Sequence, residues 1–458
     1  MTAPTSNHGR RGSVMFIVMW ALALGALILS SLQLFGYRQA MQGRDAVARV
    51  QARWAARGGV EYMIAIMADH TLAPVPNDAF AMVRDMDAFF EDEFEVGGRV
   101  ISHYDIRHDA DGIEWQGPMD EHSKLNINAT LEEGSLLTTL EDMSPDIADA
   151  IFDWLDEDDD ERPLGAELHY YQSLSIPYTP RNGPMRNIAE LEMVAGIWPE
   201  HLRGEDWDLN NRLDANEDDG EQTWPDDDAD GVLEVGWAGL LTTYSVQGPL
   251  AASGLPRIDL TRTDTEELVE RLGFEEEQAD ALISFARESD ASLESLLTAQ
   301  ILRAKQAGES ESSRGRRRQP TQQLAGPELT TDQLRAVFAE TMIGEFSGRP
   351  PGKINLNTVS EDLLRQLMFG REHLADEIVY LRLSGLEGIP SIVDLVEIPA
   401  FQEDTATLEL LARISDTTSN VYSICSRGRS FPSGVEVEII AVVDRSTLPI
   451  RILEYREQ

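Results

Sequence analysis

The longest apolar run in the chain lies near its N-terminus, from Val14 to Phe35, and it contains no charged residue. At about 1.5 Å of rise per residue, one helix of this length crosses the hydrocarbon layer of a membrane. It has no polar face to turn to water, so it is not an ordinary core helix. Arg10 and Arg11 precede it and favour a cytoplasmic location for that end. The pattern predicts a single-pass membrane protein with most of its chain outside the cytoplasm.

The apolar run continues into an amphipathic pattern instead of ending. Apolar residues recur at helical spacing among arginines and glutamines, namely Val47, Val50, Trp54, Val60, Met63, Ile64 and Met67. A cleaved secretory signal would have an apolar core of only roughly 7–15 residues, followed by a small-x-small cleavage site. We therefore expect one long helix over residues 13–70, preceded by a polar leader at 1–12.

Strand patterns occur in two parts of the chain that are far apart. Residues 98–106 and a segment from Ile113 read as two strands joined by a turn at 109–112, after a short helix in a loop at 71–95. Three further strands rich in Val and Ile are expected at the C-terminal end, at 420–426, 435–443 and 450–455. The fold class is therefore α+β. An antiparallel sheet is formed from residues 71–119 and 416–458, and it is split by a helical insertion at 120–415.

The insertion contains one motif three times: basic, apolar, Asn or Asp, apolar, Asn or Thr. The copies begin at Lys124, Arg257 and Lys353, and helices are expected after them at 145–155, 275–287 and 371–383. The third copy ends on a second short helix at 392–398. The Asn and Thr side chains are good N-caps for the helix that follows. Each unit resembles a helix-hairpin-helix module. We expect the three units at about 120–200, 255–300 and 352–400, with an acidic insert at 201–250 between the first and the second.

Charge and cysteine content narrow the function. The 81 acidic and 38 basic residues give a net charge of −43, which repels phosphate backbones and disfavours nucleic acid as a partner. The hairpin at 368–371 also lacks the Gly-x-Gly of DNA-binding modules, and the basic run 314–318 lies in a Ser, Gln and Gly-rich stretch typical of a linker. Cys425 is the only cysteine, so no intrachain disulfide forms, and a buried position on a strand is expected.

Two acidic stretches have the spacing of calcium-binding loops. Positions 1, 3, 5, 7, 9 and 12 of an EF-hand loop are matched by Asp206, Asp208, Asn210, Arg212 (through its carbonyl), Asp214 and Glu217. Asn211 takes the place usually given to glycine, and Asn tolerates the left-handed conformation needed there. The other stretch alternates Asp156, Asp158 and Asp160, and Glu167 is available to close the site. We predict calcium at both, against the alternative of plain solvated acidic runs. A third stretch, 226–231, lacks the closing Glu.

The N-terminal pattern of Arg10-Arg11-Gly12, apolar helix and amphipathic continuation resembles a type IV prepilin. This resemblance implies cleavage by prepilin peptidase after Gly12, which leaves Ser13 as the new N-terminus. Most of these proteins carry Glu as the fifth mature residue, but Ile17 stands there, as is typical of the minor pseudopilin K family of type II secretion. Two further motifs resemble the corresponding segment of the same family. One is Asp153-Trp154 with the acidic run that follows it, and the other is Gly-Ala-Glu at 165–167, followed by Tyr170-Tyr171.

The resemblance implies a structural protein that caps the tip of a periplasmic pseudopilus and helps to initiate its assembly. The implied partners are the minor pseudopilins of types I and J, the major pseudopilin, the inner-membrane secretion platform and prepilin peptidase. The chain would cross the inner membrane once, with its bulk in the periplasm and calcium in its acidic loops. Two alternatives stay open: a DNA-uptake pilus component that uses the helix-hairpin-helix units, and a membrane-anchored hydrolase. The hydrolase would rest on loose pairs of acids, because the chain has no zincin, nucleophile-elbow or Walker motif.

Overall fold

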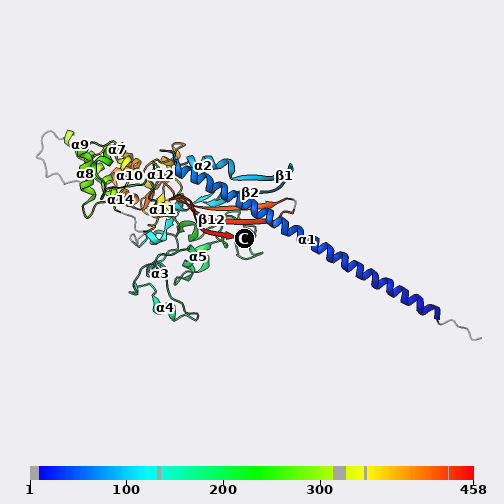
Figure 1. Cartoon of the computed structure of the whole chain (residues 1–458). Helices are drawn as coiled ribbons and strands as arrows, with labels where there is room; N and C mark the ends of the chain where they lie inside the picture. Colours follow the sequence, from blue (N-terminus) through cyan, green and yellow to red (C-terminus); the bar gives the residue numbers. More distant parts are fainter. Residues whose placement is uncertain (1–9, 111, 132–135, 313–325, 345–347, 432) are drawn as a thin grey trace, which may run out of the picture.

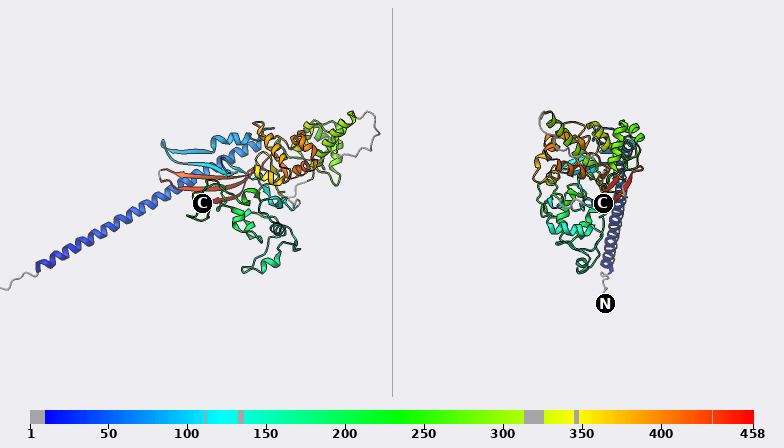
Figure 2. Two further views of the ribbon diagram at one scale, coloured as in Figure 1. Left: turned by 180° about the vertical axis from the view of Figure 1, so that it is seen from behind. Right: turned by 90° about the vertical axis from the view of Figure 1, so that its left-hand side faces the viewer.

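A computed structural model describes residues 10–458 apart from 111, 132–135, 313–325, 345–347 and 432 (Figure 1). The predicted leader therefore lies largely outside the described residues, as does the basic run 314–318. The first element, helix α1 (Arg10–Leu72), is continuous over 63 residues, close to the predicted 13–70. Within the described part of the chain it is the one helix long and apolar enough to cross a membrane. Its first half projects away from the body and its second half lies on the sheet (Figures 1 and 2).

The main sheet is antiparallel and joins the two ends of the chain. Its strand order is β1 (Glu91–Val96), β2 (Arg99–Ala110), β11 (Val421–Ser430), β12 (Glu436–Asp444) and β13 (Arg451–Glu457). The short strands β3 (Ile113–Gln116) and β4 (Met119–Asp120) pair with β2 and β11. In the central pairing, Ser426 of β11 stands opposite Ile106 of β2. The predicted α+β fold, with a sheet split by a helical insertion, is confirmed. Cys425 is buried on β11, as expected.

The prediction for residues 71–95 is partly wrong. Helix α2 (Ala81–Met86) and the 3-10 turn η1 (Asp87–Phe89) do form, but residues 91–96 are the edge strand β1. Its sequence is Glu-Asp-Glu-Phe-Glu-Val, in which Phe94 is half-buried and the other five residues are exposed. An edge strand with so little buried surface has no apolar alternation by which the sequence could reveal it.

The face by which α1 contacts the sheet also differs from the predicted stripe. Val60, Met63 and Met67 are buried as expected, in a core with Tyr104, Ile106, Ile424, Ile439 and Ala441 of the sheet. Nearer the membrane, however, Val47, Val50 and Trp54 are exposed, and the buried positions are Ala48, Ala52, Ala55 and Ala56. Small side chains face the sheet there because the helix approaches the strand backbone closely.

The insertion is built from three units, and each is closed by a pair of two-residue parallel strands. The pairs are β5 (Leu125–Asn126) with β6 (Leu241–Thr242), β7 (Ile258–Asp259) with β8 (Thr341–Met342), and β9 (Ile354–Asn355) with β10 (Ser415–Asp416). The first strand of every pair lies in the repeated sequence motif. The second unit therefore extends to residue 342, beyond the expected limit of 300.

Short helices fill the units around one shared hydrophobic core. The first unit follows η2 (Glu121–Ser123) and contains η3 (Ile127–Ala129), η4 (Leu137–Thr139), α3 (Pro145–Leu155), α4 (Leu168–Gln172), η5 (Ile188–Met193), α5 (Pro199–Arg203) and α6 (Trp237–Leu240). The second contains α7 (Thr265–Leu272), α8 (Glu276–Ala286), α9 (Leu293–Ser312) and α10 (Thr331–Glu340). The third contains α11 (Glu361–Leu367), α12 (Glu372–Leu383), η6 (Ile392–Glu397), α13 (Pro399–Glu403) and α14 (Thr405–Ile414).

The basic residue of each motif has the same structural role in all three units. It donates to a main-chain carbonyl near the end of the helix that precedes the closing strand. The pairs are Lys124 with Ala238 (2.7 Å), Arg257 with Phe338 (3.1 Å) and Lys353 with Ala412 (2.7 Å). A cation at a helix C-terminus satisfies a carbonyl that has no intrahelical donor and complements the helix dipole.

The motif asparagines cap turns, and not the α-helices that follow as the sequence suggested. Asn126 and Asn355 each accept a hydrogen bond from the backbone N–H two residues on, at 3.0 and 2.9 Å. The second asparagine of a motif acts over a longer distance. Asn128 forms two bonds with the main chain of Met185, and Asn357 forms two with Ile389, just before η5 and η6. The repeat is thus held by side chains that bond to backbone across each unit.

Candidate calcium sites

Carboxylates gather at two places in the described part of the chain. One cluster consists of Asp206, Asp208 and Glu217, and the other of Asp156, Asp158 and Glu167; in each, the candidate ligand atoms lie within 4.8 Å of one another. All six residues were singled out from the sequence. Their roles as ligands remain a prediction, but the fold does bring them together in the expected groups.

The first cluster belongs to the loop 206–217, which is folded around its own carboxylates. Asp206 accepts the backbone N–H groups of Asn210 and Asn211, both at 2.9 Å. Glu217 accepts those of Trp207 and Asp214, at 2.9 and 3.1 Å. Asn211 has φ 54°, the left-handed conformation that its place in the EF-hand pattern predicts. The first and last acids of the pattern thus hold the loop closed from both ends.

Asn210 lies among the acids of this loop. Its side-chain NH₂ donates to Asp208 and Asp214, both at 3.2 Å, and to Glu438 of β12 at 3.0 Å. Its Oδ1 is buried and has no hydrogen-bond partner within the described part of the chain, and the residue is 2 % exposed. A buried acceptor without a partner is costly. A cation beside Oδ1 would satisfy this oxygen, because amide oxygens are among the ligands that calcium binds.

The remaining predicted ligands of this loop have other contacts. Asp214 accepts a hydrogen bond from Arg427 of β11 at 2.6 Å, so one of its oxygens is engaged outside the loop. The side chain of Arg212 pairs with Asp105 of β2 at 2.7 Å. Neither residue is in the tight group of three acids. Both instead tie the loop to the sheet.

The environment of the loop disfavours charged carboxylates in the absence of a cation. Burial, with the charge of Asp206 beside it, raises the pKa of Glu217 to about 8. Burial and the same neighbour raise the pKa of Asp208 to about 6, and burial raises the pKa of Asp206 itself. A divalent cation held by these oxygens would supply the missing positive charge and lower these pKa values again.

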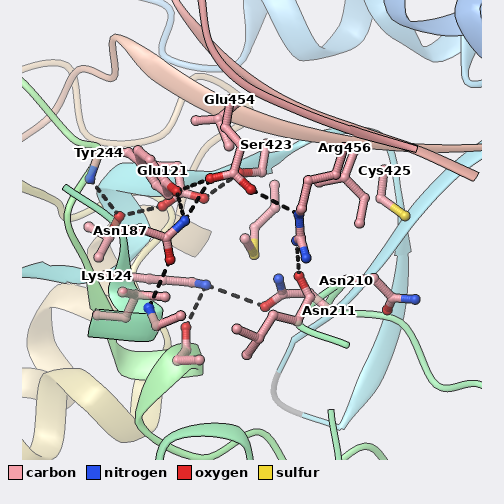
Figure 3. A pocket seen from close by; sticks show the side chains of 18 of the residues that line it. Glu121, Lys124, Asn187, Asn210, Asn211, Tyr244, Ser423, Cys425, Glu454 and Arg456 are labelled. Carbon is pink, nitrogen blue, oxygen red and sulfur yellow. Dashed lines mark hydrogen bonds and ion pairs between the residues drawn. The ribbon is translucent and has the colours of Figure 1, made fainter. Parts of the chain in front are cut away.

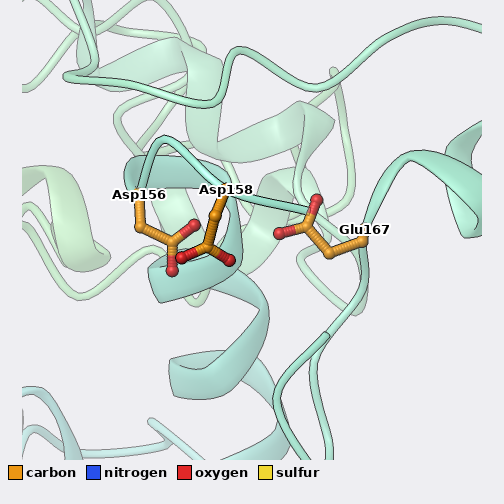
Figure 4. Close-up of side chains that lie close together, drawn as sticks. All are labelled: Asp156, Asp158 and Glu167. Atoms are coloured by element: carbon orange, nitrogen blue, oxygen red, sulfur yellow. The ribbon is translucent and has the colours of Figure 1, made fainter. Parts of the chain in front are cut away.

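The second cluster joins the end of α3 to the start of α4 (Figure 4). Asp156 follows α3, and Glu167 precedes α4 and is 4 % exposed. Neither oxygen of Glu167, nor Oδ1 of Asp156, has a hydrogen-bond partner within the described part of the chain. Burial, together with the charges of Asp153 and Asp156, raises the pKa of Glu167 to about 7. Asp160 is exposed and lies outside this group.

Asp153 and Gly165 shape this second site, and the sequence showed them only as parts of a motif. Asp153 is fully buried and accepts the backbone N–H of Arg162 at 3.2 Å. A Cβ at residue 165 would stand 2.0 Å from Oδ2 of Asp153, so any larger residue there would displace this buried carboxylate. Gly165 thereby lets the loop fold tightly enough to bring Glu167 back to Asp156 and Asp158.

A cavity of about 330 Å³, lined by both polar and apolar residues, adjoins the loop 206–217 between the sheet and the first unit (Figure 3). Arg456 pairs with Glu454 at 2.9 Å, and the side chain of Asn187 donates to Glu454 at 2.8 Å. Lys124 also lines the cavity, and burial lowers its pKa. Asp208 and Asn210 form part of the wall, so one side of the loop faces this cavity.

A sequence model of the family "Type II secretion system (T2SS), protein K" matches residues 120–204. This segment contains the entire second cluster and begins at the boundary between the sheet and the insertion. The chain is thus similar to type II secretion system protein K. Protein K of Klebsiella pneumoniae is 24% identical over 211 residues, which cover 42% of this chain and 59% of that protein. Protein K of Pectobacterium carotovorum subsp. carotovorum is 26% identical over 225 residues, 44% of this chain and 61% of that protein.

The matched region therefore spans about three fifths of the length of these protein K relatives. Among solved structures, a chain of the GspK–GspI–GspJ complex of the enterotoxigenic Escherichia coli type 2 secretion system aligns with a TM-score of 0.44. It is 12% identical, and the alignment covers 91% of this chain and 99% of that chain.

Proposed function

We propose that this protein is a minor pseudopilin of a type II protein secretion system, of the protein K type. The observation that carries the proposal is the match of residues 120–204 to protein K, located where a helical insertion interrupts the sheet. The long apolar helix fits a single-pass anchor, and we place it in the inner membrane with the body in the periplasm. Its role is structural, without a catalytic step.

Within the pseudopilus we propose a position at the tip, where the protein helps to initiate assembly. Ile17 takes the place at which most pseudopilins are expected to carry a Glu that pairs with the N-terminal amine of a neighbour. An isoleucine cannot form that pair, so a position inside the shaft would stabilise this subunit less than it stabilises one that carries the Glu. The insertion adds bulk beside the sheet that would obstruct neighbours in a packed fibre (Figure 2). The proposed partners are the minor pseudopilins of types I and J, the major pseudopilin, the secretion platform and prepilin peptidase.

We also propose that both carboxylate clusters bind calcium. The unpartnered oxygens of Asn210, Asp156 and Glu167 support this, because calcium is bound by amide and carboxylate oxygens. Asp206, Asp208 and Glu217 would hold one ion with Asn210, and Asp156, Asp158 and Glu167 the other. When bound, the ion supplies positive charge to loops that would otherwise carry several mutually repelling carboxylates.

Gold labelling of assembled pseudopili tests the tip position. Leu386 is 90 % exposed, whereas Cys425 is buried, so a Leu386→Cys variant presents one reactive thiol to maleimide-gold. We expect one particle at one end of each fibre. A thiol placed on the major pseudopilin serves as the control and should decorate the whole shaft. Particles of the Leu386→Cys variant along the shaft would overturn the proposed position.

A further inference from the structure

The loop 206–217 is bonded to three strands of the sheet, although it belongs to the insertion. Arg427 of β11 donates to Asp214 at 2.6 Å, and Glu438 of β12 accepts from Asn210 at 3.0 Å. Arg456 of β13 donates to the carbonyl oxygens of Asp208 and Leu209, at 2.9 and 2.7 Å. Every one of these contacts joins residues more than 200 positions apart in the sequence.

A fourth strand, β2, holds the other side of the same loop. Asp109 accepts the backbone N–H of Leu213 at 2.8 Å and donates its own backbone N–H to the carbonyl oxygen of Asn211 at 2.6 Å. Asp105 accepts from Arg212 at 2.7 Å. The loop is thus attached to β2, β11, β12 and β13 through residues 208–214, which lie between the proposed ligands Asp206 and Glu217.

The cluster 156–167 offers a contrast within the same chain. Among the residues that the structure describes, its hydrogen bonds and ion pairs stay inside the first unit: the side chain of Asn182 donates to the carbonyl oxygen of Asp158 at 2.8 Å, and Arg162 pairs with Asp153 at 3.6 Å. A cation there would order one loop of the insertion. A cation in the loop 206–217 would order a connection between the insertion and the sheet.

We infer that the loop 206–217 is a calcium-dependent clasp that fixes the helical insertion onto the sheet, whereas the cluster 156–167 stabilises only its own surroundings. This inference rests on the proposed calcium binding. Without a cation, the acids of the loop repel one another at the spacing that the sheet contacts require. Calcium removes the repulsion and favours the attached geometry. Because such coupling is reciprocal, the sheet must in turn raise the calcium affinity of the loop.

Hydrogen exchange on the full chain in detergent, with calcium and with chelator, tests the first half of the inference. Chelation should raise exchange in the loop 206–217 and also in β2 and β13. The Glu217→Gln variant should show this raised exchange even with calcium present. Glu167→Gln is the matched control: it removes a ligand of the other cluster, so calcium should still protect β2 and β13.

Calcium titration of an Arg456→Met variant tests whether the sheet raises the calcium affinity of the loop. Every protein in this titration also carries Glu167→Gln, so that only the loop 206–217 responds to calcium. Removal of a cation beside a cation site would by itself strengthen calcium binding, because a repulsion is lost. The clasp predicts the opposite sign, with an affinity about fivefold weaker or more. Arg451→Met on the exposed part of the same strand changes the charge equally and should leave the affinity near that of the background.

The outcomes separate the clasp from calcium binding itself. If calcium binds but its removal changes exchange only inside the loop 206–217, the clasp is overturned and the calcium proposal stands. A gain in affinity for Arg456→Met would also overturn the clasp. If titration shows that neither cluster binds calcium, both the calcium proposal and the clasp are overturned.

Discussion

Gly428 of β11 lies directly against the main chain of Ala52 in α1. A Cβ at residue 428 would stand 2.0 Å from the carbonyl oxygen of Ala52 and 2.6 Å from the backbone nitrogen of Ala56. The obstacle is backbone on both sides, and it cannot rotate away as a side chain can. The helix and the sheet are therefore in backbone contact at this point, and glycine is the residue that allows it.

Replacement of this glycine should separate the helix from the sheet. We expect Gly428→Ala to lower the free energy of unfolding by about 2 kcal/mol or more, because a forced shift of packed backbone is at least as costly as core overpacking. Thermal unfolding of the full chain in detergent measures the loss. Gly385→Ala is the control, since a Cβ there meets no heavy atom within 4 Å among the described residues, and its stability should stay close to wild type.

Processing at the N-terminus follows from the pilin-type pattern. We expect prepilin peptidase to cut between Gly12 and Ser13, because Arg10-Arg11-Gly12 directly precedes the apolar span, at the end for which the positive charges predict a cytoplasmic location. N-terminal sequencing of protein isolated from the native envelope should begin at Ser13. A mature N-terminus elsewhere in residues 14–35 would contradict the assignment to pilin-like proteins.

Calcium should stabilise the protein by mass action. At a free calcium concentration of about a hundred times the dissociation constant, one site contributes roughly 2.7 kcal/mol, which corresponds to several degrees in Tm. Thermal melts in calcium and in chelator measure this difference. Glu217→Gln and Glu167→Gln should each remove part of it, and the double variant nearly all. Identical melts in the two buffers would mean that the acidic loops are only solvated.

The stability of the calcium-free protein should fall as the pH rises. Glu217 and Glu167 have raised pKa values of about 8 and about 7, against 4.5 for an unperturbed Glu. At pH values between the unperturbed pKa and the raised pKa, the folded chain holds protons that the unfolded chain has released. Unfolding therefore becomes more favourable as the pH rises through this range. Above about pH 8 the dependence should level off. Calcium replaces those protons, so its stabilising effect should be smallest near pH 5 and largest near pH 8.

Melting curves at several pH values, with chelator and with calcium, measure this dependence. Glu217→Gln should flatten the chelator curve, because glutamine does not titrate. A calcium-free protein that becomes more stable from pH 5 to pH 8 would contradict the raised pKa values.

Asn357 should be essential to the third unit. Its amide donates to the carbonyl oxygen of Ile389 at 3.0 Å and accepts from the N–H of the same residue at 2.7 Å. Asn357→Ala would leave both buried backbone groups without partners, at a cost of about 2–4 kcal/mol in unfolding free energy. Urea unfolding provides the measurement, and His373→Ala at an exposed position of α12 is the control. Equal stabilities of the two variants would show that water replaces the amide.

Local patterns predicted much of this molecule. The C-terminal strands, α3 and the acids of both clusters could be found because their signals lie within a few neighbouring residues. The alanine face of α1 could not, since Ala52 is buried only because Gly428 meets it from the other end of the chain. The same holds for Glu438, Arg427 and Arg456, which carry no local pattern and reach the loop 206–217 only through the pairing of distant strands.

Helix α1 has no proline and no break between the bilayer and the sheet. Residues 36–47 separate the apolar span from Ala48, the first buried position of the helix where side chains are described, and they hold the body about 18 Å from the hydrocarbon. A flexible linker of that length would take up an axial displacement of the anchor as slack. A continuous helix in backbone contact with β11 would instead transmit such a displacement directly to the sheet.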